Sequence, residues 1–305
     1  MMLNALITGA TGFVGLRLIN HLRQEGFAIR IIGRSAISGV ESILCDFLVD
    51  FIPENAFKDI DIVFHLAGHT HDLKNTTEAE SAYRKLNEDV TDDLLSLSVK
   101  YNVKKFIFVS SVKAGGRPLK GGSFSEVEQN YSNGLYGETK REAELKVLKA
   151  GQSYNIHVSI LRPALIYGPK VKGNLKLMIQ GIKKGWFPPL PETGNRRSMI
   201  HVDDVVQALS LLASDQRSKD EIFIVTDGRA YSSRDIYEIM CSTLGKRIPR
   251  WAVPQFLFHV LASINPHLRY RIGKLLGDEY YSSKKIQSIG FKAKKTLKDI
   301  HETNF

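Results

Sequence analysis

Tyr136 and Lys140 stand four residues apart in LYGETKREAE, a stretch with the pattern of a helix start. Side chains at this spacing project from one face of a helix, so a phenol and an ammonium group would lie together. A phenol normally keeps its proton up to a pH of about 10. A neighbouring cation favours the phenolate and suits a tyrosine to general acid–base chemistry. The alternative is a solvent-facing pair, which any helix can carry.

Two serines, Ser110 and Ser111, follow the apolar run KKFIFV. Open α/β sheets bind their ligands at the carboxyl ends of the strands, where these serines would lie. The Ser111 hydroxyl could hydrogen-bond a substrate oxygen while Tyr136 handles its proton, although a strand-end cap is the simpler interpretation. Ser111, Tyr136 and Lys140 together form our candidate catalytic set.

Three glycines, Gly9, Gly12 and Gly15, lie three apart in NALITGATGFVGLRLINHL, between a strand-like run and a helical one. In this context the first glycine permits a tight turn and the second lets the backbone approach a pyrophosphate. The third allows the helix to pack closely on the strand. The amide groups at the helix start then face the anion. The loop therefore predicts dinucleotide binding rather than an ordinary turn.

Apolar runs that alternate with helical stretches indicate a parallel sheet covered on both faces. Helices are expected at Glu78–Tyr101 and Tyr136–Ala150, and strands in the runs at 3–8, 27–34, 61–68, 104–111, 156–163 and 221–228. We expect an α/β fold with a Rossmann-type doubly wound parallel sheet in residues 1–168, completed by strands from the later chain. Residues 169–305 would form mainly a smaller C-terminal α/β lobe for substrate. The apolar stretch 251–264 would be a buried or lid helix.

The chain has 305 residues and a formal net charge of +10. We find no signal peptide and no apolar run near the roughly 20 residues of a spanning helix. Cys45 and Cys241 lie far apart and predict buried thiols in a reducing compartment. No metal site is indicated. The densest basic stretch, 170–184, lacks interleaved aromatics and is interpreted as a solvated face. We expect a cytoplasmic protein with neither nucleic acid nor membrane among its partners.

The sequence resembles the extended short-chain dehydrogenase/reductases, in the branch of sugar-nucleotide epimerases and dehydratases. TGATGFVG is similar to that branch's cofactor loop, HLAG (65–68) to its fourth-strand motif, and ILRPALIYGP to its strand after the catalytic helix. NEDVT resembles its asparagine motif through Asn87, with Val90 where glycine is usual. The resemblance implies that Lys140 holds the nicotinamide ribose and lowers the tyrosine pKa, and that the two long helices pair in a homodimer. It implies cofactor contacts at Gly9, Thr11, Gly12, Phe13, Val14, Gly15, Arg34, Asp46, Phe47, Leu66, Ala67, Gly68, Asn87, Val109, Tyr136, Lys140 and Pro163. Substrate contacts would fall on His71, Lys113, Asn174 and Arg197.

The end of the second strand, IIGRS, bears on the choice of cofactor. Gly33 occupies the place where an acidic residue would bind both ribose hydroxyls of NAD, and Arg34 follows it. Glycine removes a charge that would repel a 2′-phosphate, and arginine offers that phosphate a bidentate partner. NADP(H) is therefore favoured. NAD(H) is the alternative, because an arginine here could also be solvated or stack on adenine.

The two residues after Ser111 narrow the choice of reaction. Family 4,6-dehydratases have Asp-Glu after the catalytic residue, whereas Val112 and Lys113 stand here and argue against a dehydratase. The resemblance then implies a UDP-sugar 4-epimerase or 4-ketoreductase of the O-antigen type, acting at C4 of a nucleotide-activated hexose. A non-catalytic dinucleotide sensor or RNA-associated protein is an alternative, although it would not need the Ser-Tyr-Lys set. A reductase of small non-nucleotide carbonyls is another.

Overall fold

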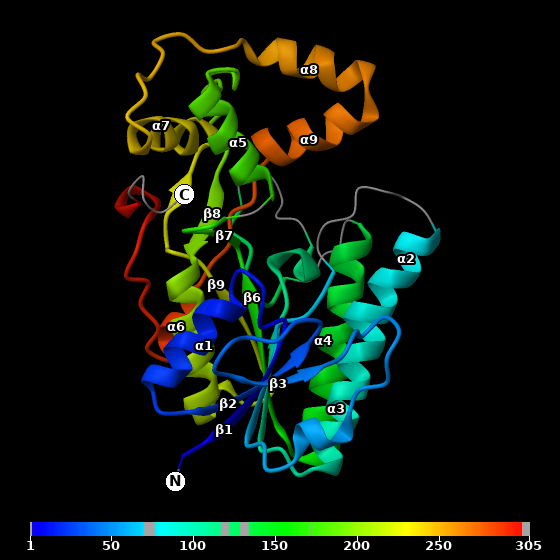
Figure 1. Ribbon diagram of the computed structural model, residues 1–305. Helices are drawn as coiled ribbons and strands as arrows, with labels where there is room; N and C mark the ends of the chain where they lie inside the picture. The colour runs from blue at the N-terminus through cyan, green and yellow to red at the C-terminus, as the bar shows by residue number, and fades with distance from the viewer. Residues whose placement is uncertain (1, 70–76, 117–121, 129–133, 172, 301–305) are drawn as a thin grey trace.

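A sheet of seven parallel strands forms the centre of the molecule, in the order β3-β2-β1-β4-β5-β6-β9 (Figure 1). The computed structural model describes residues 2–69, 77–116, 122–128, 134–171 and 173–300. Strand order reverses between β1 and β4, the kind of switch point at which doubly wound sheets bind ligands. In sheet order the strands are β3 (Glu41–Leu44), β2 (Ala28–Gly33), β1 (Asn4–Thr8), β4 (Ile62–His65), β5 (Lys105–Val109), β6 (His157–Pro163) and β9 (Glu221–Val225).

Helices cover both faces of this sheet, which explains the continuous apolar runs of its central strands. Every residue of β4 and β6 is buried. One face packs against α1 (Gly15–Gln24), α6 (Val202–Ser214) and α10 (Lys284–Ser288), and the other against α3 (Val90–Lys100) and α4 (Leu135–Tyr154). Figure 1 shows α1 and α6 on one side of the strands and α3 and α4 on the other. The predicted α/β doubly wound fold is confirmed.

The helix expected at 78–101 is interrupted by a π-helical segment. The chain forms α2 (Thr77–Arg84), a π segment η2 (Lys85–Asp89) and then α3. Such insertions are rare and gather at functional sites. Here the inserted turn contains Asn87, whose side chain is fully buried. The second predicted helix continues one turn further than expected, to Tyr154, and Asn155 ends it with a φ of +53°.

The later chain contributes both to the large sheet and to a second layer. Strand β9 and helix α6 return to the seven-stranded sheet. A small sheet in the order β10-β8-β7 lies above it, next to α5 and α7 (Figure 1). These elements are β7 (Leu165–Tyr167), α5 (Gly173–Lys184), β8 (Arg197–His201), β10 (Ala230–Tyr231), α7 (Ser233–Thr243), α8 (Gln255–Ile264) and α9 (Pro266–Leu276). Phe13 of the glycine loop packs against the core of this second layer.

The helix expected at 251–264 differs from the prediction in its start and its burial. It begins at Gln255, because Pro254 before it has a ψ of 137°, outside the helical range. Phe258 is its buried side chain, whereas Phe256 and Ile264 are exposed. Of the two alternatives, the buried helix was therefore wrong, and the lid helix stays a prediction. Short 3₁₀ segments complete the described chain: η1 (Glu54–Phe57), η3 (Val112–Gly115), η4 (Gln216–Ser218) and η5 (Leu297–Asp299).

Candidate active site

Ser111 and Tyr136 meet at the carboxyl edge of the sheet, as the sequence predicted. Ser111 follows β5 and caps η3, where its Oγ accepts a hydrogen bond from the Lys113 amide at 3.2 Å. Tyr136 lies in the first turn of α4 and is half-buried. The Ser111 side chain lies close enough to Tyr136 to lower the pKa of its phenol. A serine hydroxyl and a phenol at this edge can together hold one substrate oxygen.

Lys140 lies one turn after Tyr136 on the same helix and is almost completely buried. Its Nζ donates to the carbonyl oxygen of Val109 at 3.1 Å and lies 4.6 Å from the centre of the Phe108 ring. Removal from water lowers the pKa of Lys140 to about 8, and the nearby Glu144 carboxylate opposes that shift. The hydrogen bond to Val109 thus holds Lys140 at the end of β5, where Ser110 and Ser111 follow.

The pKa of Tyr136 differs from the sequence-based expectation. Burial raises the pKa of Tyr136 to about 12, because a phenolate loses its hydration there, and the hydrogen bond from Ser111 opposes the shift. The resemblance implies instead that Lys140 lowers this pKa. In the structure Ser111 is the partner that stabilises the phenolate, while the Lys140 ammonium is turned to the Val109 carbonyl. Tyr136 is therefore held in its protonated form, ready to donate.

Asn87 links three segments around this site. Its Oδ1 accepts from the His69 amide at 2.9 Å, and its Nδ2 donates to Thr139 Oγ1 at 2.9 Å and to the His69 carbonyl at 3.3 Å. A side chain on Gly68 would have its Cβ 2.8 Å from Asn87 Oδ1 and 2.9 Å from Lys140 Nζ. Gly68, Asn87 and Lys140 therefore lie close together. The π turn places the Asn87 side chain where it can make these contacts.

His65 forms a second buried link, which sequence reasoning did not assign. Its Nδ1 lies 2.7 Å from Thr8 Oγ1 and its Nε2 lies 3.0 Å from Thr91 Oγ1. Thr91 donates its own proton to the Asn87 carbonyl at 2.8 Å, so it must accept one from His65 Nε2. Burial lowers the pKa of His65 well below its ordinary value, consistent with this neutral tautomer. Both His65 and Thr91 lie in motifs noted in the sequence, HLAG and NEDVT.

A buried ion pair stands behind the catalytic helix. Glu144 follows Lys140 by one further turn, and its carboxylate receives two hydrogen bonds from Arg162 of β6, at 2.8 Å and 2.5 Å. Both side chains are essentially inaccessible to water. The pair joins α4 to β6 directly beneath Tyr136 and Lys140. Glu144 and Arg162 stabilise the position of α4 only while both are present. Either charge alone would be buried without a partner, which is strongly unfavourable.

The glycine loop packs so closely on neighbouring backbone that it cannot carry side chains at Gly9 and Gly15. A Cβ on Gly9 would lie 2.7 Å from the Ala67 amide nitrogen, and one on Gly15 would lie 2.4 Å from the Gly9 carbonyl oxygen. Gly9 also has a φ of +67°, which favours glycine. Within the described ranges, the buried Ser110 hydroxyl has no hydrogen-bond partner. A backbone cradle at a helix start and an unsatisfied hydroxyl at the end of β5 fit a dinucleotide.

The remaining predicted cofactor residues line the same edge. Arg34 is exposed at the end of β2, and a Cβ on Gly33 beside it would meet no neighbour within 4 Å. Asp46 is half-buried, with Oδ1 accepting from the Leu48 amide at 3.1 Å. The others lie at or near the same carboxyl strand ends: Thr11 is exposed, Phe13, Val14, Leu66, Ala67 and Val109 are half-buried, and Phe47 and Pro163 are buried.

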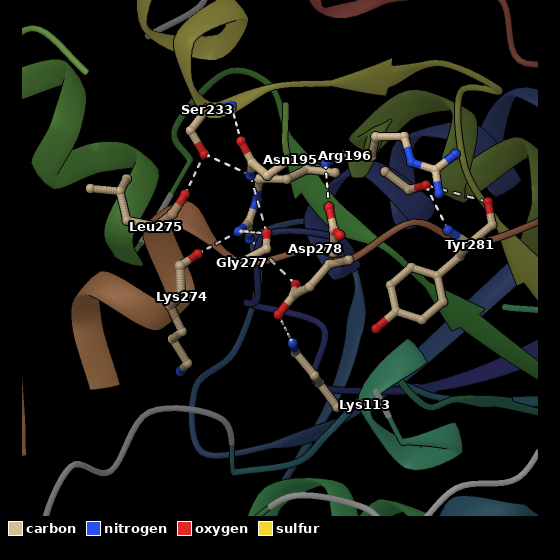
Figure 2. Close-up of polar contacts among 12 residues, drawn as sticks. Lys113, Asn195, Arg196, Ser233, Lys274, Leu275, Gly277, Asp278 and Tyr281 are labelled. Carbon is tan, nitrogen blue, oxygen red and sulfur yellow. Dashed lines mark hydrogen bonds and ion pairs between the residues drawn. The ribbon is translucent and has the colours of Figure 1, made fainter. Parts of the chain in front are cut away.

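A polar network fastens the second layer to the catalytic edge (Figure 2). The Lys113 ammonium pairs with Glu279, and Arg197 binds the other oxygen of the same carboxylate at 3.3 Å. Arg197 also donates to the carbonyls of Lys274 and Gly277. Sequence reasoning missed Glu279, which lies 166 residues from Lys113. Of the other predicted substrate residues, Asn174 is exposed near the start of α5, and His71 lies outside the described residues.

Comparisons with known proteins agree with this geometry. Residues 5–226 match the model of the family described as NAD dependent epimerase/dehydratase. A UDP-glucose 4-epimerase of Vibrio cholerae is 30% identical over 82% of this chain and 77% of its own. The UDP-glucose 4-epimerase of Thermotoga maritima, solved with UDP-glucose, superimposes with a TM-score of 0.80 at 20% identity, covering 99% of this chain and 97% of that one. A UDP-glucuronic acid 4-epimerase from Bacillus cereus, solved with NAD, gives 0.80 at 19% over the same shares.

Proposed function

The chain belongs to the NAD-dependent epimerase/dehydratase family, and we propose that it carries out oxidoreduction at C4 of a UDP-activated hexose. The neighbouring side chains of Ser111 and Tyr136, with Lys140 one helical turn away, support this proposal above all. Tyr136 moves the proton of the C4 oxygen. Ser111 orients that oxygen by donating to it, because a hydroxyl can give one hydrogen bond and accept another. General acid–base catalysis of this kind contributes roughly 10²–10⁴ in rate.

A nicotinamide dinucleotide is the cofactor we propose for the glycine cradle. When bound, it supplies or accepts the hydride at C4. Gly9, Gly12 and Gly15 hold the pyrophosphate through backbone amides, and Lys140 and Asn87 border the place for the nicotinamide end. Lys140 binds the ribose hydroxyls there, and the Ser110 hydroxyl finds its missing partner. The positive ring of an oxidised cofactor would lower the pKa of Tyr136 from its present high value.

NADP(H) is the form of the cofactor that we favour. Arg34 is exposed at the end of β2 and is free to form a bidentate contact with a 2′-phosphate. The space beside Gly33 is open, so no side chain obstructs that phosphate. NAD(H) is the alternative, since several structurally similar epimerases were solved with NAD. Asp46 keeps one carboxylate oxygen for the adenine end in either case.

The substrate would lie between the catalytic edge and the second layer. Lys113 borders Ser111 and faces the sugar, and Asn174 at the start of α5 is our candidate for the nucleoside diphosphate. Arg197 is better suited to hold the segment 274–279, because its guanidinium already binds two carbonyls and Glu279. A homodimer through α2–α3 and α4, as the resemblance implies, remains our expectation for the assembly.

The proposal excludes a 4,6-dehydratase, because Val112 is apolar and Lys113 is paired with Glu279. It leaves a 4-epimerase and a 4-ketoreductase. The protonated Tyr136 suits the reductase, which must donate a proton to a keto sugar.

A panel of UDP-sugars and one UDP-4-keto sugar, each incubated with and without NADPH, separates the epimerase from the reductase. Epimers formed without NADPH identify the epimerase, and stoichiometric NADPH loss with the keto sugar identifies the reductase. If neither reaction occurs with any of these substrates, the proposed function is wrong.

A further inference from the structure

Helix α8 lies at the end of the molecule farthest from the N-terminus (Figure 1). It exposes a continuous apolar stripe. The stripe recurs at helical spacing, so its members share one face. We define the α8 surface as Phe256, Leu257, Val260, Leu261 and Ile264, of which Phe256 and Ile264 are 63% and 73% exposed. Exposed apolar residues are common singly, but a contiguous group on one helix face marks an interaction site.

The opposite face of α8 already has its packing partners. Phe258 is buried in the core of the second layer, together with half-buried Ile272 and Leu275 of α9. Arg269 of α9 donates to the Ala262 carbonyl at 3.1 Å, which joins the two helices. The orientation of α8 is therefore set by burial on one side. The α8 surface is left facing outward by a helix that is otherwise anchored.

Both tryptophans of the chain are exposed beside this layer. Trp251 lies just before α8 and is 64% exposed, and Trp186 lies just after α5 and is 61% exposed. Tryptophan is enriched where a protein meets the interface of a bilayer, because its ring is apolar and its N–H is polar. An exposed tryptophan directly before an apolar helix face, with a second one on the same layer, is typical of interfacial binding.

The two segments of the chain that carry α8 and α5 are basic, and Glu238, paired with Arg234 beside Pro249, is the acidic residue that precedes the first of them. Residues 239–277 contain six lysines and arginines and no aspartate or glutamate. Residues 168–190, which include α5, contain five lysines and again no acidic residue. Lys246, Arg247 and Arg250 are exposed immediately before α8. A positive rim around an apolar stripe is complementary to a surface that is negative at its headgroups and apolar beneath them.

We propose that the α8 surface docks the protein on an anionic lipid bilayer. A second copy of the chain is a poorer occupant, since it would bring two cationic rims together. Nucleic acid is poorer too, because Leu, Val and Ile gain nothing from phosphates. No helix in the described ranges has the length and apolarity to cross a bilayer, so the contact is peripheral. This inference replaces our sequence-based expectation of no membrane partner and does not depend on the proposed reaction.

Co-sedimentation with vesicles tests the proposal. The full chain should pellet with vesicles containing phosphatidylglycerol and stay in solution with pure phosphatidylcholine. Each lost basic residue should weaken binding about fivefold. The double variant Arg247→Gln/Arg250→Gln should therefore bind roughly 25-fold more weakly, whereas Lys58→Gln/Lys292→Gln, also exposed, should bind as the wild type does. The emission of Trp251, isolated by Trp186→Phe, should shift to shorter wavelength on binding.

Two phenylalanine variants test the contribution of the apolar side chains to vesicle binding. Phe256→Ser removes an exposed ring from the α8 surface, and Phe51→Ser removes one that is 98% exposed elsewhere. The first should lose most of the vesicle binding and the second should keep it. Equal binding by both variants, or no binding of the wild type to phosphatidylglycerol vesicles at low salt, would overturn the proposal. So would a wild-type dimer on light scattering that Phe256→Ser dissociates while vesicle binding is absent, since a second copy would then be the occupant.

Discussion

The catalytic edge and the α8–α9 end of the molecule are built in opposite ways. At the catalytic edge, polar groups are buried and paired: His65 between two threonines, Asn87 across three segments, and Glu144 against Arg162. At the α8–α9 end, apolar groups are exposed and the charges are all of one sign. The difference shows that this chain fixes its candidate catalytic groups with interior polar contacts and leaves apolar side chains exposed on its outer lobe.

The largest difference between the two regions is expected when a buried charge is removed from one and an exposed charge from the other. Arg162→Leu leaves the Glu144 carboxylate buried without its partner, so we expect the free energy of unfolding to fall by about 3–5 kcal/mol. Arg250→Leu, at an exposed position before α8, should change it by less than about 0.5 kcal/mol. Urea denaturation of both variants measures this. Equal losses in the two variants would mean that the buried pair does not anchor α4.

Acid should destabilise the catalytic edge through His65. Burial keeps the pKa of His65 well below 6.5 in the folded protein, whereas the unfolded chain binds the proton near that pH. Stability from this group is therefore present above pH 6.5 and is lost as the pH falls, by about 2 kcal/mol at pH 5. His65→Gln should flatten the fall measured by urea denaturation at pH 7 and pH 5. The exposed His259→Gln on α8 should retain it, and an unchanged slope in His65→Gln contradicts the assignment.

Glycine substitutions compare the two regions at the level of the backbone. A Cβ at Gly15 would press on backbone atoms of Gly9 and Ala10, so Gly15→Ala should cost about 1–3 kcal/mol and weaken dinucleotide binding at least tenfold. Gly273→Ala in α9 meets no neighbour within 4 Å and should be neutral or stabilise by up to about 1 kcal/mol. Thermal unfolding and titration calorimetry measure the two effects. Intact dinucleotide affinity in Gly15→Ala would exclude the loop as the cradle.

The smallest effect we expect is on the choice of cofactor. Arg34→Ser removes the exposed guanidinium beside Gly33 and should reduce the preference for NADPH over NADH by roughly tenfold, with little change in stability. Fluorescence titration with both dinucleotides gives the ratio. A preference unaltered by the substitution would assign Arg34 to solvent and favour NAD(H).

Much of this molecule could be predicted from its sequence where local pattern carries the information. The glycine loop, the apolar strands and the spacing of Tyr136 and Lys140 each lie within one short stretch. Strand β3 was missed because it has four residues, two of them polar, at an exposed edge, so no apolar run marks it. The π turn was missed because Asn87 is held by His69 and Thr139, neither of which a helical pattern reveals.

Long-range contacts account for the rest of the structure that the sequence did not reveal. The Lys113–Glu279 and Glu144–Arg162 pairs join residues that are far apart in the chain. No local sequence pattern indicates that either pair forms. The raised pKa of Tyr136 in the absence of a cofactor could not be predicted for a related reason. Spacing places a lysine on the same helix face, but burial and the Val109 carbonyl, both supplied by tertiary packing, decide where that ammonium points.

The central claim is that Tyr136 moves the proton at C4 beside a bound nicotinamide. It is tested most directly by single-turnover absorbance of the nicotinamide in the full chain, with the best substrate from the panel. Tyr136→Phe should bind the dinucleotide with near wild-type affinity and change its redox state at least 10²-fold more slowly. A variant that turns over at the wild-type rate would contradict the account.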